Sequence, residues 1–453
     1  MSWKKTRLED ILTESKIISE KPNPDRRITV RLKVLGVEKR GLENEVEGAT
    51  KQYIRKAGQF IYGKQNFHKG AFGIVPTELD GFESSSDLPA FDVDKSCLPE
   101  FIFYFFKQGN FYLELSKIAS GVATQRINTT QLFEIEILLP DIKTQKQLIS
   151  NIQLLEKNGS QISNELTYQL TLVKKLRQQL LQDAVQGKLV EQNKKDEPAS
   201  QLLKKIKAEK EKLIAEKKLK KEKELPPIKP EDIPFEIPEN WAWCRLGEIL
   251  EILTDYHANG AYEKLKDNVT MSDEEDYAIM LRTTNYHKKN YYDYKYISQT
   301  AYNFLQKSKV YAGDLIMNKI GDPGTVFFVD ERGKPMSLAM NLFLLRLNKS
   351  ISNTYIYSYL KLQQAYIKSF AAGTTSMTIT KDAVKELLVP LPSLAEQNRI
   401  VQRLDELMQT CNDLEVSIKQ SESQNSTLLQ QVLREALRKE KLTISSSVVE
   451  YKN

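Results

Sequence analysis

Cysteine and histidine are scarce in this sequence of 453 residues, which contains three of each. Cys97, Cys244 and Cys411 lie far apart along the chain, so they cannot form a C-x-x-C redox or metal motif. The histidines are equally scattered, which excludes an H-E-x-x-H zinc helix. We therefore expect free thiols, a reducing compartment and no bound metal ion.

Long apolar runs and nucleotide-binding loops are also missing. No apolar stretch is long enough to span a bilayer and the first residues do not form a signal peptide, so we expect a cytoplasmic protein. There is no glycine-rich phosphate loop, no G-x-S-x-G elbow, and no Asn-Pro-Pro-aromatic tetrapeptide of the kind that holds a flipped adenine in amino-methyltransferases. The acidic run 272–276 lacks the spacing and the glycine of a calcium loop. No catalytic constellation emerges from these motifs, and we expect that the chain binds no cofactor itself.

Positive charge is in small excess, with a net charge of +6. Residues 204–223 contain ten lysines and four glutamates, and this difference of six accounts for the whole excess. A nucleic-acid surface elsewhere would therefore need an uneven distribution of charge rather than a surplus. The lysine-rich stretch and the proline-rich segment after it are typical of a solvated helix and an extended linker, with a DNA-binding arm as the alternative.

One sequence pattern occurs twice. The segment GVATQRINTTQLFEIEILLPDIKTQKQLI, from Gly121, aligns without a gap with GTTSMTITKDAVKELLVPLPSLAEQNRIV, from Gly373, at an offset of 252 residues. WKKTRLEDIL from Trp3 matches WAWCRLGEIL from Trp241 at an offset of 238, and KAGQFIYGK matches YAGDLIMNK at an offset of 255. Two related modules therefore lie in tandem. The changes of offset place 17 additional residues early in the second module (255 − 238) and remove three later (255 − 252).

Each module begins with short apolar or alternating runs between glycine turns and ends in a long helix. This order predicts a mixed α/β fold in both modules. Asp141 after Pro140, and Ser393 after Pro392, predict the starts of the long helices. The predicted segments are a globular domain 1–143, a spacer helix 144–192, a lysine-rich helix and proline linker 193–236, a second globular domain 237–394, a second spacer helix 395–440 and a tail 441–453.

Alternating steps of four and three residues give an apolar seam in both long helices. The seam residues are Leu148, Ile152, Leu155, Ile162, Leu166, Val173, Leu176 and Leu180 in the first helix, and Ile400, Leu404, Leu407, Leu414, Ile418, Leu428 and Val432 in the second. Such a narrow stripe favours one partner helix, and the two helices most simply pack on each other. Polar steps at Gln169, Ser421 and Asn425 would fix the register, and Gly159 is a possible kink. Helices of about 40 residues would be roughly 60 Å long, which suits a spacer; a hairpin that only joins domains or forms a dimer is the alternative.

Polar and basic loops occupy equivalent places in the two modules. The candidate DNA-binding residues are Lys64, Gln65, Asn66, His68 and Lys69 after a strand of the first module, Asn318 and Lys319 at the same place in the second, Thr124, Gln125 and Arg126 after the first shared glycine, Thr374, Thr375 and Ser376 after the second, and Asn285, Tyr286, Lys288 and Lys289 in a loop of the second module only. Amide and cationic groups can distinguish base pairs, while hydroxyl groups and backbone amides suit phosphates. Ordinary surface polarity is the alternative for each residue.

Taken together, these patterns resemble the specificity (S) subunit of type I restriction-modification systems. The resemblance is carried by the two glycine-to-helix segments, clearest in GTTSMTITKDAVKELLVPLPSLAEQNRIV, and by the paired openings RLEDIL and RLGEIL. The helix end QLLQDAVQGKLV and the connector KAEKEKLIAEKKLKKEKELPP leading to IPENWAW agree with it. The similarity covers nearly the whole chain apart from the last dozen residues, and it is specific as an ensemble.

The resemblance implies that residues 1–143 and 237–394 are target-recognition domains, each reading one half of a bipartite double-stranded DNA target. The two helices would form an antiparallel coiled coil that sets the gap between the half-sites. The subunit would have no catalysis of its own. It would instead bind two methyltransferase (M) subunits, which use S-adenosylmethionine on adenine N6, and motor-nuclease (R) subunits, which use ATP and Mg²⁺ to translocate and cut DNA.

The two modules differ at some of the positions that carry the resemblance. KTQKQL in the first replaces AEQNRI in the second, and KQNFHKGAFG lacks the turn of KIGDPG. Recognition loops are expected to differ if the half-sites differ. A stand-alone DNA-binding or scaffold protein without enzymatic partners is the alternative function, and a nuclease with an unrecognised acidic site is another.

Overall fold

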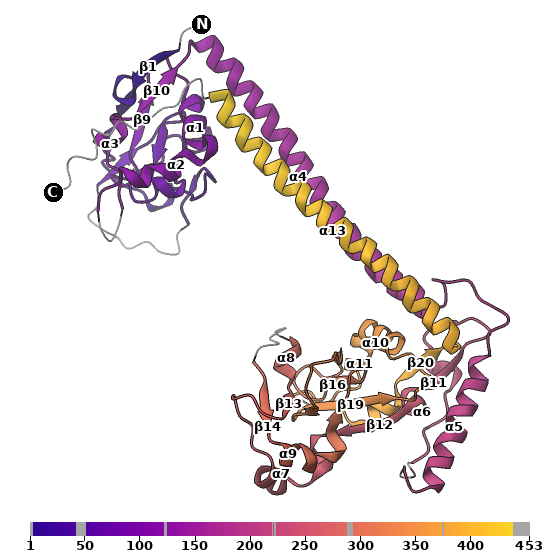
Figure 1. The fold of residues 1–453 in the computed structure, drawn as a ribbon. Coiled ribbons are helices and arrows are strands. Elements are labelled where there is room, and N and C mark those ends of the chain that lie inside the picture. Colours follow the sequence, from indigo (N-terminus) through magenta and orange to yellow (C-terminus); the bar gives the residue numbers. More distant parts are fainter. Residues whose placement is uncertain are drawn as a thin grey trace. The chain divides into compact units, whose positions relative to one another are not determined.

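The computed structural model describes residues 3–41, 51–121, 125–219, 221, 223–287, 293–373 and 376–437. The chain divides into two compact units (Figure 1). Unit 1 comprises Met1–Gln169 with Ser417–Asn453, and unit 2 comprises Leu170–Val416. This division passes through the middle of both long helices, so each unit contains a part of each helix beside its globular part.

Unit 1 is built on an antiparallel sheet of short strands. The sheet has the order β2-β9-β6-β7. The strands are β1 (Lys4–Arg7), β2 (Leu12–Glu14), β3 (Ile28–Val30), β4 (Val37–Lys39), β5 (Gln52–Ile54), β6 (Phe60–Tyr62), β7 (Phe72–Ile74), β8 (Glu83–Ser85), β9 (Ala90–Val93) and β10 (Glu136–Leu139). Outside the main sheet, β1 pairs with β10, β3 with β4, and β5 with β8, all antiparallel.

Phenylalanine dominates the core of unit 1. Phe60, Phe67, Phe72 and Phe106 are fully buried, and their ring centroids lie 4.8–6.4 Å apart. The α-helices that enclose this core are α1 (Pro99–Lys107), α2 (Phe111–Glu114), α3 (Thr129–Phe133), the first part of α4 (Ile142–Val185) and the last part of α13 (Leu394–Leu437). The edge-to-face and offset contacts of these rings stabilise the core beyond the area that they bury.

Unit 2 contains a four-stranded sheet of the same kind and a second sheet. Their orders are β12-β19-β16-β17 and β14-β13-β18-β15, and β11 pairs separately with β20. The strands are β11 (Ala242–Arg245), β12 (Leu250–Asp255), β13 (Ala278–Leu281), β14 (Lys295–Ile297), β15 (Lys309–Val310), β16 (Leu315–Asn318), β17 (Val326–Phe328), β18 (Met336–Leu338), β19 (Leu342–Leu347) and β20 (Leu388–Leu391).

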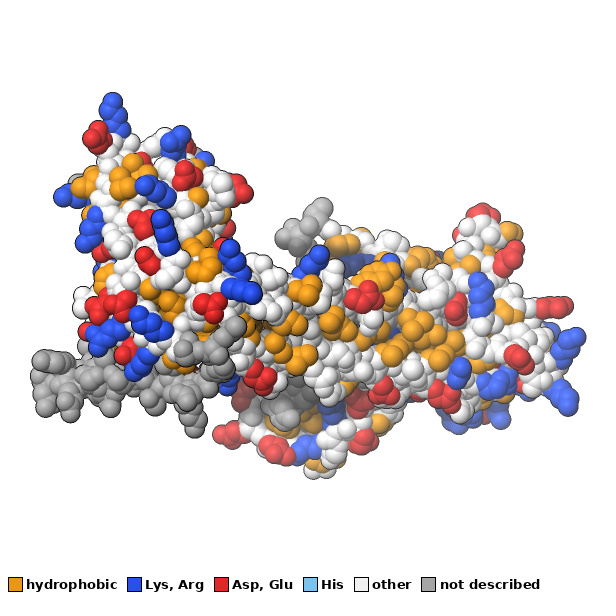
Figure 2. All heavy atoms as spheres, turned by 90° about the horizontal axis from the view of Figure 1, so that it is seen from above, with side chains coloured by type: hydrophobic (Ala, Val, Ile, Leu, Met, Phe, Trp, Pro, Cys, Tyr) orange, Lys and Arg blue, Asp and Glu red, His pale blue; other side chains and the backbone are white. Residues whose placement is uncertain are grey.

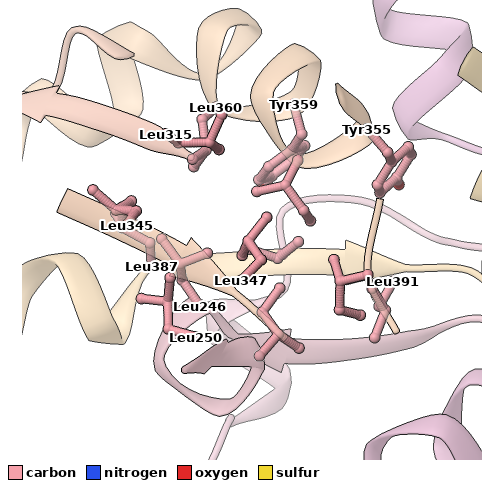
Figure 3. Packing of buried hydrophobic residues seen from close by; sticks show 14 of the residues in the cluster. Leu246, Leu250, Leu315, Leu345, Leu347, Tyr355, Tyr359, Leu360, Leu387 and Leu391 are labelled. Carbon is pink, nitrogen blue, oxygen red and sulfur yellow. The ribbon is translucent and has the colours of Figure 1, made fainter. Parts of the chain in front are cut away.

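The core of unit 2 lies between the main sheet and α10, and it is rich in leucine (Figure 3). Two buried tyrosines of α10 end in hydrogen bonds to β20, from Tyr355 Oη to Pro390 O (2.8 Å) and from Tyr359 Oη to Leu388 O (2.7 Å). The remaining helices are α5 (Ala199–Ala215), α6 (Leu246–Ile249), α7 (Tyr262–Asn268), α8 (Thr283–His287), α9 (Gln299–Phe304), α10 (Asn353–Leu362), α11 (Gln364–Lys368) and α12 (Lys381–Glu386).

The strand pairings confirm the tandem repeat and the mixed α/β fold. The order β2-β9-β6-β7 recurs as β12-β19-β16-β17, and the pair β1·β10 recurs as β11·β20. The second sheets also correspond, because β3·β4 and β5·β8 are joined by a parallel bridge between Arg27 and Glu83, giving the order β4-β3-β8-β5. In unit 2 the equivalent parallel contact, between β13 and β18, extends over three residue pairs.

Hydrogen bonds to acidic and hydroxyl side chains mark the starts of the long helices, as predicted. Asp141 Oδ1 accepts from Thr144 N (2.9 Å), and Ser393 Oγ accepts from Glu396 N (3.1 Å). α4 continues without a break through Gly159, so this glycine does not interrupt the helix.

Of the fifteen residues predicted for the apolar seam, ten are buried or half-buried and five are exposed. In α4, Ile152, Leu166, Val173 and Leu180 are buried or half-buried, whereas Leu155, Ile162 and Leu176 are 38%, 48% and 44% exposed. In α13, Leu414 and Leu428 are 44% and 61% exposed. The more enclosed positions are the next residues along each helix, namely Glu156, Ser163, Leu170 and Arg177 in α4 and Glu415 and Leu429 in α13. In α4, the row of Leu155, Ile162 and Leu176 and the row one residue further along both repeat every seven residues. The first row is the more apolar, so hydrophobicity alone predicted that it would be enclosed, and this was wrong.

The enclosed polar residues have partners, which explains why polarity is tolerated there. In unit 1, Asn425 Nδ2 donates to Gly159 O (2.9 Å) and Ser163 Oγ (3.1 Å). In unit 2, Arg177 donates to Glu415 Oε2 (2.6 Å) and Asn412 Oδ1 (2.7 Å). Ile149 shares a core cluster with Leu437 in unit 1, and Val185 shares one with Ile400 in unit 2. Within each unit, therefore, the segments of α4 and α13 lie side by side and run antiparallel (Figure 1).

Candidate nucleic-acid interface

The first two predicted loops lie together in both units. Ile127 N donates to Lys64 O (2.9 Å) in unit 1, and Ile379 N donates to Lys319 O (3.1 Å) in unit 2. Each loop after the shared glycine is closed by a backbone bridge, between Ser120 and Arg126 and between Ala372 and Thr378. We call the two joined loops, with the bridge that closes the second loop, the loop frame. The same loop frame therefore occurs in both units with different side chains.

The shared glycine is required by the backbone of this frame. Gly121 has φ 103° and Gly373 has φ 127°, values that side-chain-bearing residues rarely adopt. A Cβ at Gly373 would lie 2.4 Å from Ser376 O. Gln125, Arg126 and Ser376 are exposed beside the bridges, while Thr124, Thr374 and Thr375 lie outside the described residues.

The strand-exit loop of unit 1 folds around a buried aromatic ring. Asn66 O accepts from Lys69 N (2.9 Å) and Ala71 N (3.0 Å), and Phe67 is fully buried beneath the loop. Lys64, Gln65, Asn66 and His68 are half-buried, and Lys69 is exposed. Burial and, secondarily, the charge of Lys69 lower the pKa of His68, which favours the neutral imidazole.

Two predicted contacts in unit 2 must be corrected, because their side chains are buried. Asn318 is 0% and Asn285 is 2% exposed, so neither side chain can reach a partner in solvent. Asn285 instead accepts from Arg282 N (3.0 Å) and donates to Asp293 O (2.9 Å). The backbone of Asn318 bonds to Thr325 O (2.8 Å) and Gly324 N (2.9 Å), which closes the turn after β16. Both asparagines shape loops.

Tyr286 also serves packing at the base of its loop. Its ring lies 4.9 Å from that of Phe327 and 6.0 Å from the Arg332 guanidinium carbon. Burial raises the pKa of its phenol to about 12, although nearby Arg332 opposes this shift. Lys288 and Lys289, predicted in the same loop, lie outside the described residues.

Lys319 belongs to a charge cluster that the sequence did not reveal. Its ammonium lies 3.3 Å from Asp255 Oδ2, and Lys381 Nζ lies 3.1 Å from Oδ1 of the same carboxylate. Burial alone would raise the pKa of Asp255, but the hydrogen bonds and charges of Lys381 and Lys319 outweigh it and lower the pKa. One carboxylate thus positions two half-buried lysines beside the loop frame. Lys381 was missed because it lies 62 residues further along the chain (381 − 319).

The sequence analysis also missed a basic hairpin in unit 1, formed by β3 and β4. Arg31, Lys33, Lys39 and Arg40 are exposed on it. Lys33 N donates to Lys69 O (2.9 Å) and Val34 N donates to Gly70 O (2.8 Å), so the hairpin tip rests on the predicted strand-exit loop. The alternating pattern RITVRLKVLGVEKR signals this hairpin, but it has no counterpart among the motifs shared by the two modules.

Metal-binding groups do not converge in the described part of the chain. Among those residues, no group of three or more His, Cys, Asp or Glu side chains is arranged to hold a metal ion. Cys97, Cys244 and Cys411 are free and buried, and burial raises the pKa of the Cys97 thiol to about 12. In the same residues, no helix is both long enough and apolar enough to cross a membrane.

Comparison with known proteins decides the family. The family model of the type I restriction modification DNA specificity domain matches residues 2–172 and 238–421. The chain belongs to this family. Two matches at these places agree with the two repeats seen in the strand pairings, and the resemblance read from the sequence is confirmed. Specificity subunits of type I systems are the non-catalytic, DNA-recognising subunits.

Individual relatives support the assignment. The chain is 32% identical over 281 residues to the EcoAI specificity subunit of Escherichia coli, covering 59% of this chain and 46% of that protein. It is 28% identical over 300 residues to the EcoEI specificity subunit of the same species, covering 63% and 49%. The matches to these curated relatives thus span about half of their length.

A solved structure shows the same fold. The HsdS subunit from Thermoanaerobacter tengcongensis superposes with a TM-score of 0.58 at 16% identity, covering 97% of both chains. A chain from a structural study of complex assembly and conformational transition of the type I R-M system gives the same TM-score and identity, covering 97% of this chain and 98% of that one. At this identity the likeness concerns the fold alone, and the predicted fold of two tandem α/β domains is confirmed.

Proposed function

We propose that this chain is a specificity subunit that binds double-stranded DNA through one surface on each unit and reads a target in two halves. The observation that supports this most is the repeated loop frame, closed by the same backbone hydrogen bond at Lys64 and at Lys319. Side chains on the frame differ, with Gln65-Asn66 in unit 1 where unit 2 has Ile320-Gly321. A common frame with different side chains suits two half-sites of different sequence.

Local charge, rather than net charge, would bring the frames to DNA. In the view of Figure 2, basic and acidic side chains are interspersed over the surface. Within unit 2, Asp255 holds Lys319 and Lys381 in place before any ligand arrives. Ammonium groups fixed in this way suit phosphate oxygens, and Lys69 and Arg126 would serve the same purpose in unit 1.

The long helices would act as the spacer between the half-sites, paired as an antiparallel coiled coil. Deleting one heptad from each helix, for example 160–166 with 421–427, removes matched turns around the contact of Asn425 with Ser163. Seven residues correspond to about 10 Å of helix, or about three base pairs. We expect a shorter unspecified gap with both half-sites unchanged. Altered half-sites with an unchanged gap would contradict the spacer role.

The exposed apolar row of α4 is the surface that we assign to the methyltransferase subunits. Within unit 1, Leu155 and Ile162 lie seven residues apart in this row and are each more than a third exposed. Burying a fully exposed leucine or isoleucine contributes about 1.5–3 kcal/mol. Because Leu155 and Ile162 are 38% and 48% exposed, covering the exposed part contributes about 0.6–1.4 kcal/mol, and Leu155→Gln or Ile162→Gln should weaken M-subunit binding roughly threefold to tenfold. Lys157→Gln, at an exposed polar position of the same helix, is the matched control. Unchanged co-purification of M subunits with the Leu155 and Ile162 variants would exclude this surface.

Catalysis and cofactors would belong to the partners. S-adenosylmethionine would be bound by the two M subunits, and ATP with Mg²⁺ by the R subunits. Methylation-sensitive single-molecule sequencing of the source genome, with and without this gene, tests the whole proposal. We expect a split motif with one modified adenine on each strand to disappear on deletion. An unchanged methylome in cells that express the protein and its M subunit would favour a stand-alone DNA-binding protein.

A further inference from the structure

The β3–β4 hairpin of unit 1 has a composition unlike the rest of the unit. Between Arg26 and Arg40 the chain carries six basic residues and one acidic residue, Glu38. Arg27 is half-buried near Glu83 (3.8 Å), and the other five basic side chains are exposed. The tip adds two apolar side chains, Leu32 and Leu35, which are 44% and 67% exposed. Such leucines have no role in the core of the unit.

The tip is held rigidly in an unfavourable backbone conformation. Lys33 and Val34 have φ values of 58° and 60°, which are rare for residues with a side chain and particularly unfavourable for the β-branched Val34. Their amides are fixed by Lys69 O and Gly70 O. Gly70 itself has φ 81°, and a Cβ there would lie 2.9 Å from Val34 N. The strand-exit loop and the hairpin thus form one preorganised surface.

The shape and charge of this surface fit duplex DNA. A two-stranded ribbon can enter the major groove, where apolar side chains contact thymine methyl groups and flanking cations contact phosphates. Exposed basic side chains outnumber exposed acidic ones. The ion pair between Arg31 and Glu38 (2.9 Å), which joins the two strands of the hairpin, is solvent-exposed and therefore weak. A protein partner would need a wider apolar surface than two leucines provide.

We propose that the β3–β4 hairpin enters the major groove of the half-site read by unit 1, with Lys33 on a phosphate and Leu32 and Leu35 against base edges. This inference rests on the proposed DNA-binding function. It makes the hairpin a specificity-determining element of the first module, in addition to the loop frame that both modules share.

The test uses the full chain with its M subunits and a fluorescent duplex that carries the split motif identified by methylation sequencing. The slope of log affinity against log salt is negative, and Lys33→Ala should make it less steep by about 0.9, for cognate and altered duplexes alike. The double variant Leu32→Ala, Leu35→Ala should keep that slope but reduce the preference for the cognate first half-site over an altered one by about fivefold to 100-fold. Its preference at the second half-site should not change.

Lys95→Ala is the matched control for charge. Lys95 is exposed and follows β9 at Val93, at the opposite end of the main sheet from the loop that follows Tyr62. Two outcomes would overturn the proposal. One is that Lys33→Ala has the same salt dependence as Lys95→Ala. The other is that the double leucine variant retains full preference at the first half-site. If the wild-type complex shows no preference for the motif, the proposed function itself fails.

Discussion

Replacing Gln397 with alanine should destabilise unit 2, because this side chain joins the start of α13 to the start of α10. Gln397 is 0% exposed. Its Oε1 accepts from Ser352 N (2.8 Å), and its Nε2 donates to Pro392 O (3.0 Å). Truncation leaves a donor and an acceptor without these partners. At roughly 1–3 kcal/mol for each unsatisfied buried group, the expected loss is about 2–6 kcal/mol.

A buried glutamine makes the same kind of hydrogen bonds in unit 1. Gln145 is also 0% exposed; its Oε1 accepts from Leu98 N (2.8 Å), and its Nε2 donates to Ser96 O (2.9 Å) and Pro140 O (2.8 Å). Gln145 and Gln397 are related by the offset of 252 residues. Since Gln145 has one more carbonyl partner, Gln145→Ala should cost unit 1 at least as much as Gln397→Ala costs unit 2.

Urea unfolding followed by circular dichroism measures the loss, and hydrogen exchange assigns it to α1 or α10. The matched controls are Gln147→Ala on α4 and Gln402→Ala on α13, at exposed positions of the helices that contain Gln145 and Gln397. Each should change the free energy of unfolding by less than about 0.5 kcal/mol. If Gln397→Ala has no larger effect than Gln402→Ala, the hydrogen bonds of Gln397 do not contribute to stability, and the reasoning above is refuted.

Three further predictions concern single positions. Burial raises the pKa of the Glu396 carboxyl, so the ionised form of this side chain destabilises the folded state. Glu396→Gln keeps an acceptor for Trp241 Nε1 and removes the charge. In thermal melts, the stability of this variant relative to wild type should therefore increase as pH rises from about 4 to about 7. Gly159→Ala should stabilise unit 1 by about 0.5–1 kcal/mol in urea unfolding, because the new Cβ would lie 3.8 Å from Asn425 Oδ1 and replaces a helical glycine; destabilisation would show that this space is not available. Gly70→Ala should cost more than about 1–2 kcal/mol and increase hydrogen exchange in the β3–β4 hairpin, whereas unchanged exchange would show that Gly70 does not hold it.

Repetition made the fold largely predictable from the sequence. The offsets of 238, 255 and 252 residues recur as the pairs β1 and β11, β6 and β16, and β10 and β20. Periodicity also predicted both long helices, and the capping residues Asp141 and Ser393 predicted where they begin. Periodicity did not predict which residues of α4 face α13, because Leu155 and Ile162 are as apolar as buried residues are. Only the hydrogen bonds of Ser163 and Arg177 show which row is enclosed.

The candidate site was less predictable, because side-chain burial depends on contacts between distant segments. Asn318 and Asn285 have suitable chemistry for reading bases, yet the strands and turns around them bury both side chains. Conversely, Lys381 joins Lys319 only through Asp255, which lies in a third segment. A comparison of shared motifs also omits segments whose sequences differ between the modules. β3 pairs with β4 as β13 pairs with β14, but the basic sequence of the first pair is not repeated in the second, so the β3–β4 hairpin was missed.

The polar contacts between the long helices have a consequence for the spacer role that we propose. An apolar seam alone would permit the helices to slide by a heptad, since each leucine would meet another apolar residue. Sliding would separate Asn425 from Gly159 and Ser163, and Arg177 from Glu415 and Asn412. Partly buried charges and amides would then lose their partners, at a cost of roughly 1–3 kcal/mol for each group. The polar residues that weaken the seam therefore fix one register. A spacer with a single register is what a fixed gap between two half-sites requires, and such a gap should change only by insertion or deletion of matched turns in both helices.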